Sequence, residues 1–421
     1  MTFSRFRPGW STQLAVGYGL DVRSLALLRL GLAVTLLAVV GAHLGGGATD
    51  GVGGEPRSRL IEDGLRLWLS GLPTEQPWLQ GSLLVLTAIA ALLLLVGYQT
   101  GKSAIAAWIL VSLLPSHASA SLLRGEDWLP SALFWAMFLP LGASYAIDSA
   151  MNPQQPTLPK RLFSAATVAL MVRQCWVYGF LGGLVWHATA LSRWLFVLWW
   201  GGLLLLWIPG QIAVFRTVAV GVMGLLTLGL GLAVPADLAF GLSGLTWLAF
   251  LPPAVWQAAI QRSYGSAQAG LTIYYDADCG FCKKVVHLLR TFLLLPSTPL
   301  LTAQSDPSIC ADMETQNSWV VVDWQGKRHF KFAAIAYIVS LSPVFRFLAP
   351  ILRWPPLMAT GTRFYETIAN NRKAAGRFTQ PFKFRSFDLK PPAWVDWTVW
   401  GLLAICAIAN SYRLFAGGWR G

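Results

Sequence analysis

The chain has 421 residues, of which 55% are hydrophobic and only 12% are charged, and its formal net charge is +13. This composition excludes an ordinary soluble protein of the same length and predicts a multi-span membrane protein. A strongly basic chain can bind nucleic acid, but beside a membrane the charge favours contact with anionic lipid headgroups. We therefore expect membrane lipids, and no nucleic acid, as partners.

Apolar stretches suited to membrane helices, which need about 20 residues each, recur over the first 260 residues. Eight spans are predicted, at residues 25–46, 82–98, 104–115, 129–147, 162–190, 194–208, 214–234 and 238–256. A ninth candidate, residues 394–416, contains Asp396 and Asn410. The predicted fold class is an α-helical membrane domain of about eight to nine spans over residues 1–260, followed by a small α/β domain.

The distribution of charge predicts the orientation. With the N-terminus in the cytosol, Lys102, Lys160 and Arg161 fall in cytosolic loops, as the positive-inside rule prefers, and the net acidic loop 50–75 falls on the other side. Eight spans return the chain to the cytosol. The segment 271–390, with fifteen Lys or Arg against eight Asp or Glu, is therefore predicted to be cytosolic.

The pattern changes after a polar linker at residues 261–270. Strands are predicted at residues 271–277, 299–304, 318–324 and 328–332, and helices at 282–294 and 333–342. This order is typical of a small thioredoxin-like domain, which we assign to residues 271–390. Residues 391–421 are predicted to form a C-terminal membrane or interfacial helix.

Residues 343–358, "PVFRFLAPILRWPPLM", place Arg346 and Arg353 among large apolar side chains. Such a segment can be part of the core of the domain. It can also lie in the headgroup layer, with its arginines on lipid phosphates and its aromatic side chains inward. The second interpretation predicts that the α/β domain is held close to the bilayer.

Two of the five cysteines, Cys279 and Cys282, lie where the first predicted strand meets the first helix. The N-terminus of a helix stabilises a thiolate and lowers the pKa of the thiol, which favours Cys279 as a nucleophile. Cys282 lies one turn further on, where a second thiolate can displace a mixed disulfide. Asp278 is predicted to cap the helix.

Other interpretations of the pair are weaker. Cys279, Cys282 and His287 have the first three positions of a C-x2-C-x4-H-x4-C zinc knuckle, but Phe292 occupies the fourth. Haem attachment needs His after the second Cys, where Lys283 stands. A structural disulfide is disfavoured in a reducing cytosol. We therefore expect redox chemistry and no metal.

The stretches "YYDADCGFC", "WVVVDWQGK" and "FYETIANNR" resemble the DCC-type thiol-disulfide oxidoreductases, named for their Asp-Cys-x-x-Cys signature. The resemblance covers about residues 271–378. It implies a thioredoxin-like fold, and that Asp278, Cys279 and Cys282 form the redox motif.

Residues 24–148 resemble the horizontally transferred transmembrane family, relatives of the vitamin K-dependent gamma-carboxylase membrane domain. The motifs are "LALLRLGLAV", "LLVGYQTGK" and "RGEDWLPSALFWAMFLPLGASYAID". Carboxylase relatives use a lysine of the membrane domain as a base, but the comparable stretch here, "WVYGFLGGLVWHATALSRW", has no lysine. Carboxylation is therefore not expected.

Polar side chains in or near membrane spans are costly, so each is a candidate for function. Those selected as candidates for cofactor binding are Arg29, His117, Glu126, Asp127 and His187, with Arg173 as a further polar residue of this kind. Structural ion pairs or a wet loop would also explain them. The sequence requires no cofactor, although the aromatic content suits a quinone or a lipid.

These observations predict a membrane-anchored thiol-disulfide oxidoreductase that acts on a protein thiol or disulfide partner and is coupled to a lipid or quinone-like carrier. One alternative is a membrane-embedded enzyme that modifies a lipid or quinone and is regulated by the thiol domain. Another is a non-enzymatic scaffold or assembly factor that binds subunits of a membrane complex.

Overall fold

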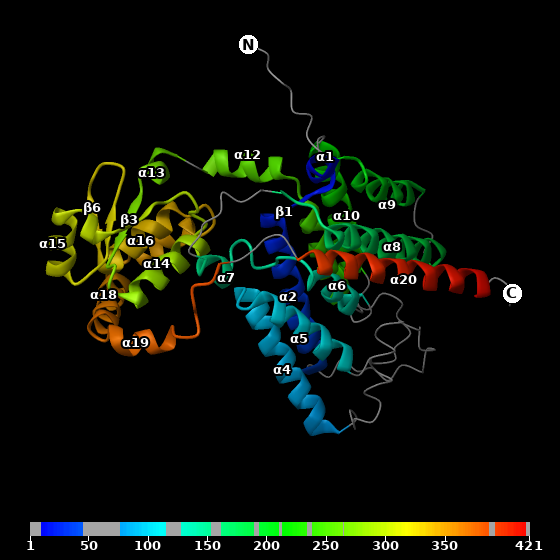
Figure 1. Cartoon of the computed structure of the whole chain (residues 1–421), viewed down its shortest axis with the longest axis horizontal. Helices are drawn as coiled ribbons and strands as arrows, with labels where there is room; N and C mark the ends of the chain where they lie inside the picture. The colour runs from blue at the N-terminus through cyan, green and yellow to red at the C-terminus, as the bar shows by residue number, and fades with distance from the viewer. Residues whose placement is uncertain are drawn as a thin grey trace, which may run out of the picture. The chain divides into compact units, whose positions relative to one another are not determined.

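The computed structural model describes residues 10–44, 76–114, 128–152, 161–188, 193–209, 213–233, 238–263, 265–386 and 392–417 (Figure 1). The chain divides into two compact units. Unit 1 comprises Met1–Ala143, Thr157–Val255 and Asp388–Gly421, and unit 2 comprises Ser144–Pro156 and Trp256–Phe387. The predicted acidic loop at residues 50–75 lies outside the described residues.

Unit 1 is built from helices and one short ladder. Leu20–Asp21 (β1) pairs antiparallel with Arg161–Leu162 (β2). The helices are α1 (Trp10–Tyr18), α2 (Val22–Leu44), α4 (Pro77–Val96), α5 (Thr100–Leu113), α6 (Leu129–Ala136), α8 (Ala165–Ala188), α9 (Arg193–Leu206), α10 (Ala213–Ala233), α11 (Leu238–Ser243), the 3-10 helix η2 (Gly244–Phe250) and α20 (Ala393–Gly417).

Three helices of the described part are long and apolar enough to cross a membrane: Val22–Leu44, Trp78–Val96 and Ala213–Leu232. Two predicted spans, 129–147 and 238–256, are not continuous helices. The first stops at Ala136, four residues before Pro140, because proline lacks the N–H that would continue the helix and its ring clashes with the carbonyl four residues earlier. The second is divided into α11, η2 and α12 (Pro253–Ser263), with Pro252 and Pro253 at the last break.

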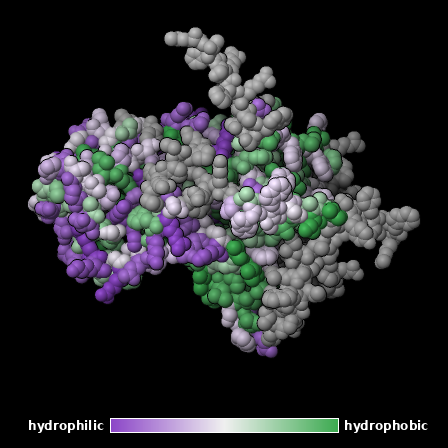
Figure 2. All heavy atoms as spheres, viewed as in Figure 1, coloured by the Kyte–Doolittle hydropathy of each residue, from purple (hydrophilic) through white to green (hydrophobic). Residues whose placement is uncertain are grey.

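Apolar side chains occupy both the inside and the outside of unit 1. On α2, Leu25, Leu28, Leu32 and Leu36 are fully buried at helical spacing and form part of the core. On α4, large apolar side chains such as Val85, Ile89 and Leu92 remain exposed, and Figure 2 shows this helix as a green surface. An exposed apolar helix of this length is typical of a lipid-facing surface.

Unit 2 contains a four-stranded mixed sheet in the order β4-β3-β5-β6. Its strands are β3 (Thr272–Tyr275), β4 (Leu300–Thr302), β5 (Val320–Val322) and β6 (Arg328–Phe330). β3 and β4 are parallel with Ile273 opposite Leu300, whereas β3 and β5 are antiparallel with Ile273 opposite Val321. All four strands fall within the predicted ranges.

Successive side chains of the central strands enter two different cores, as the strand period of two requires. Ile273 and Val321 pack with Val286 of α14 (Gly280–Phe292) and Ile338 of α16 (Lys331–Leu341). Their neighbours in the strands, such as Val320, pack with α15 (Pro307–Gln316), a helix that the sequence patterns did not predict. Figure 1 shows these helices around the sheet.

The predicted turn at Gln325–Lys327 joins β5 to β6. Asp323 closes it, because its Oδ1 accepts from the backbone N–H groups of Gln325 at 2.9 Å and Lys327 at 2.8 Å. Gly326 has φ +80°, a conformation that glycine adopts without steric cost.

The remaining elements of unit 2 are mostly short. They are α7 (Ile147–Ala150), α13 (Ser266–Ala269), the 3-10 helices η3 (Ala303–Ser305) and η4 (Arg346–Leu348), α17 (Ala349–Leu352), α18 (Pro355–Asn370) and α19 (Arg372–Phe378). The segment predicted to lie at the membrane surface thus consists of η4, α17 and the start of α18.

Candidate functional site

Cys279 and Cys282 form a disulfide where β3 passes into α14, with their Cα atoms 5.2 Å apart. Cys279 is the residue that caps α14: the backbone N–H of Cys282 donates to its Sγ at 3.2 Å. This confirms the predicted position of Cys279 at the N-terminus of the helix. Both residues are half-buried.

The prediction that Asp278 caps the helix is wrong, because Cys279 occupies the capping position. Asp278 is exposed, and its backbone N–H donates to Oδ1 of Asp276 at 3.1 Å. The carboxylate that organises the turn is therefore that of Asp276, two residues earlier.

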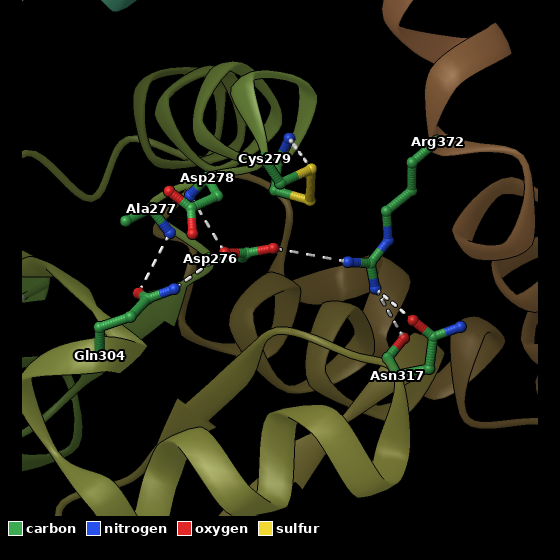
Figure 3. The surroundings of a disulfide bond; sticks show 8 residues. Asp276, Ala277, Asp278, Cys279, Gln304, Asn317 and Arg372 are labelled. Atoms are coloured by element: carbon green, nitrogen blue, oxygen red, sulfur yellow. Dashed lines mark hydrogen bonds and ion pairs between the residues drawn. A yellow bond between two sulfur atoms is a disulfide. The ribbon is translucent and has the colours of Figure 1, made fainter.

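Asp276 connects the turn before α14 to two other parts of the domain (Figure 3). Its Oδ1 accepts from Nε2 of Gln304 at 2.9 Å, and Oε1 of Gln304 in turn accepts from the backbone N–H of Ala277 at 3.2 Å. Its Oδ2 lies 3.9 Å from Nη1 of Arg372. The approach to Cys279 is thus held by side chains from η3 and α19.

Arg372 is itself fixed at the end of α15. Its Nη2 donates to Oδ1 of Asn317 at 2.6 Å and to the carbonyl oxygen of Asn317 at 3.1 Å. Asn317 has a left-handed conformation, φ 46°, at the C-cap of α15. The sequence marks Asp276 only as a charge that opposes a thiolate at Cys279, and its patterns did not select Gln304, Asn317 or Arg372 for the site. Arg372 is the last residue of "FYETIANNR", one of the stretches that resemble the DCC-type family, and this resemblance could have indicated Arg372 as a site residue.

A cavity of about 320 Å³ adjoins the disulfide within unit 2. Cys282 forms part of its wall, and Asp276 and Arg372 lie at the same cavity. Most other residues around it are apolar side chains of α14, α16 and α18, including Phe281, Val285, Phe332, Ile335, Phe364 and Ile368. Thus the Cys279–Cys282 disulfide and a mainly apolar space lie side by side.

Comparison with known families matches residues 273–378 to the family described as DCC1-like thiol-disulfide oxidoreductase. These residues form a DCC1-like domain. Comparison with curated proteins found no match, and comparison with solved structures found none either. The resemblance of residues 24–148 to the carboxylase-like membrane family stays a prediction.

The first helix of the DCC1-like domain carries a basic face. Burial, with a smaller contribution from Arg290 and Lys283, lowers the pKa of His287 to about 4. Its ring meets Phe384 edge-on at 5.5 Å, and Nζ of Lys283 lies 5.0 Å from the centre of the same phenyl ring. Nζ of Lys284 donates to the carbonyl oxygen of Thr379 at 2.6 Å. The chain after α19 therefore packs along α14.

Zinc would require Cys279, Cys282 and His287 to act together. Within the described ranges, no group of three or more His, Cys, Asp or Glu side chains could hold a metal ion. His287 is 8% exposed and packs against Phe384. The His287 ring thus lies on the face of α14 that packs against Phe384, and the expectation of no metal stays a prediction.

Among the five candidates for cofactor binding in unit 1, Arg29 is the one whose side chain the structure describes. Arg29 is 1% exposed on α2, and its Nη1 donates to the carbonyl oxygen of Leu141 at 3.4 Å. His187 lies on α8, but its side chain is outside the described part, as are the residues His117, Glu126 and Asp127 as a whole.

A buried polar chain that the sequence patterns did not predict begins at Arg173. Its Nη1 donates to Oε1 of Gln174 at 2.9 Å, and Nε2 of Gln174 donates to Oγ1 of Thr246 at 2.9 Å. Thr246 then donates to the carbonyl oxygen of Ser243, whose hydroxyl lies 2.7 Å from that of Tyr178. The chain links α8 to α11 and η2 within unit 1.

Proposed function

We propose that the chain is a membrane-anchored thiol-disulfide oxidoreductase whose redox couple is Cys279 and Cys282. The observation that supports this most directly is the position of Cys279, whose Sγ accepts the N–H of Cys282 at the start of α14. A thiolate in this position is stabilised by the backbone donors and the helix dipole, which makes Cys279 the nucleophile and the better leaving group.

In the proposed reaction the Cys279–Cys282 dithiol supplies two electrons to the substrate disulfide. The Cys279 thiolate attacks one sulfur of a substrate disulfide, which forms a mixed disulfide and releases the first substrate thiolate. The Cys282 thiolate then attacks Sγ of Cys279, which breaks the mixed disulfide and releases the second. The substrate gains two electrons and the protein keeps the Cys279–Cys282 disulfide. The reverse sequence oxidises a substrate dithiol.

The membrane part of the proposal rests on the apolar helices of unit 1 and on the exposed side chains of residues 343–354. Val344, Phe347, Ile351 and Trp354 are each more than half exposed within this short basic segment. We propose that this segment contacts lipid headgroups on the cytosolic side and that a quinone-like carrier of the membrane exchanges electrons with the couple.

The test is the reduction potential of the couple in the full-length protein in detergent. Samples equilibrated in glutathione or dithiothreitol buffers are alkylated, and the peptide that contains both cysteines is analysed by mass spectrometry. We expect a reversible couple between about −280 and −120 mV. The matched control, Cys310→Ser, should leave it unchanged. A disulfide that does not form reversibly, or bound zinc in its place, would contradict the proposal.

The buried chain from Arg173 to Tyr178 favours a second candidate function, an enzyme of unit 1 that acts on a lipid or quinone and is regulated by the DCC1-like domain. Buried polar groups within apolar helices mark functional sites more often than stable cores. Gln174→Leu should abolish such an activity, whereas the double variant Cys279→Ser/Cys282→Ser should retain it. The opposite pattern supports the oxidoreductase.

A further inference from the structure

The cavity beside Cys282 points to the class of substrate, and we propose that it binds the apolar group of a small neutral thiol or disulfide. This inference rests on the proposed oxidoreductase function and specifies its substrate. Its volume, about 320 Å³, lies at the lower end of the range for small-molecule sites.

The position of the cavity connects it to the chemistry. Cys282 belongs to its wall, and Sγ of Cys282 is bonded to Sγ of Cys279. In a mixed disulfide on Cys279, only Sγ of Cys279 therefore separates the substrate sulfur from Cys282 at the cavity wall. The group attached to that sulfur can occupy the cavity while Cys282 attacks the mixed disulfide.

The walls determine what can bind. Most of the wall is apolar and favours an apolar group. Its apolar residues include Val285 and Phe281 of α14, Ile335 of α16 and Ile368 of α18. The two charged residues at the cavity, Asp276 and Arg372, have opposite signs and lie 3.9 Å apart. Their charges balance, so the cavity favours a neutral ligand over an ion.

Trp319 also lines the cavity and is 7% exposed, but its indole Nε1 is itself buried and has no acceptor within hydrogen-bonding distance among the described residues. This N–H therefore does not open onto the cavity, and the part of Trp319 that lines it is apolar ring surface. The preferred ligand accordingly carries a neutral apolar ring or chain.

The test uses two thiols that differ only in the apolar group. 2-Mercapto-N-phenylacetamide and 2-mercapto-N-methylacetamide share the thiol and the amide carbonyl, but only the first carries a phenyl ring. Each thiolate attacks the Cys279–Cys282 disulfide, forms a mixed disulfide on Cys279 and displaces the Cys282 thiolate. A second thiol molecule then releases the small-molecule disulfide, so two thiols are oxidised and one protein disulfide is reduced.

The rate of reduction is measured on the oxidised full-length protein in detergent, by alkylation and mass spectrometry of the peptide that contains both cysteines. Because burial of a phenyl ring is worth a factor of about ten or more, we expect the phenyl compound to react at least about tenfold faster than the methyl compound. Ala369→Phe, which fills the cavity from α18, should remove this preference. Ala359→Phe, at an exposed position of the same helix outside the cavity, should keep it.

Equal rates for the two amides in the unmodified protein, or a preference that survives Ala369→Phe, would overturn the inference alone. If neither thiol reduces the disulfide, the proposed function itself fails.

Discussion

Arg372 and Asp276 form an ion pair at the cavity that Cys282 lines, with Nη1 of the arginine 3.9 Å from Oδ2 of the aspartate. The two residues belong to α19 and to the turn after β3, and each is about a quarter exposed. The guanidinium offsets a carboxylate that lies three residues before Cys279. A negative charge near a thiol disfavours its thiolate, so the guanidinium of Arg372 partly cancels the unfavourable effect of Asp276 on a thiolate at Cys279.

Arg372→Gln should therefore make the Cys279–Cys282 couple more reducing. With the guanidinium gone, the charge of Asp276 raises the pKa of the Cys279 thiol and destabilises the reduced form. For a partly exposed pair worth about 0.5–1 kcal/mol, the reduction potential should fall by about 10–20 mV. Asp276→Asn should shift it in the opposite direction. Arg377→Gln, on an exposed arginine of the same helix, is the control and should have no effect.

His287 should make the stability of unit 2 depend on pH. Its pKa is about 4 in the folded chain, against the ordinary histidine value of 6.5 that we expect when the chain is unfolded. Between these values the unfolded chain binds more protons, so the free energy of unfolding decreases as the pH falls through this window, by on the order of 3 kcal/mol.

The measurement is urea unfolding at about pH 7 and about pH 4.5, with hydrogen exchange of the β3 and β5 amides used to monitor the unfolding of unit 2. His287→Leu should show a smaller loss of stability at the lower pH than the unmodified protein. Equal losses in the two proteins would show that other groups cause the dependence.

The exposed apolar side chains of residues 343–354 should lie in the lipid headgroup layer. Phe347, which is 65% exposed, can be replaced by a fluorophore-labelled cysteine in a full-length chain whose own cysteines are serine. In lipid nanodiscs, nitroxides on the upper acyl chain should quench this fluorophore. A label at Thr315, exposed on α15, should stay unquenched. Equal quenching at both positions would contradict the specific contact.

The redox site should be accessible from the cytosol. In Cys279→Ser, a membrane-impermeant thiol reagent should modify Cys282 in inverted vesicles and leave it unmodified in intact cells. The reason is the positive-inside distribution of Lys102, Lys160 and Arg161. Labelling in intact cells would reverse the predicted orientation.

Much of the DCC1-like domain could be predicted because its signals are local. The alternation in "TIYY" and the β-branched run "VVV" specify strands, and the turn at Gly326 needs a residue that tolerates positive φ. The helix α15 was missed because "PSICADMETQ" has few apolar side chains, and only Ile309 and Met313 are buried.

Membrane spans were harder to predict, because hydropathy reports burial from water and not the continuity of a helix. Residues 129–147 are apolar throughout, yet the helix ends at Ala136 before Pro140. Hydropathy also gives no signal for Gln174 and Thr246, whose side chains meet only because α8 and η2 pack together.

The sequence by itself determined the thiol pair, its place between a strand and a helix, and the apolar character of the first 260 residues, since all three depend on neighbours along the chain. Only the tertiary structure decided that Cys279 and not Asp278 caps α14, that Arg372 faces Asp276, and that Trp319 lines a cavity with Cys282. These relationships join residues up to 96 positions apart, and the packing of α14, α16, α18 and α19 around one sheet brings them together.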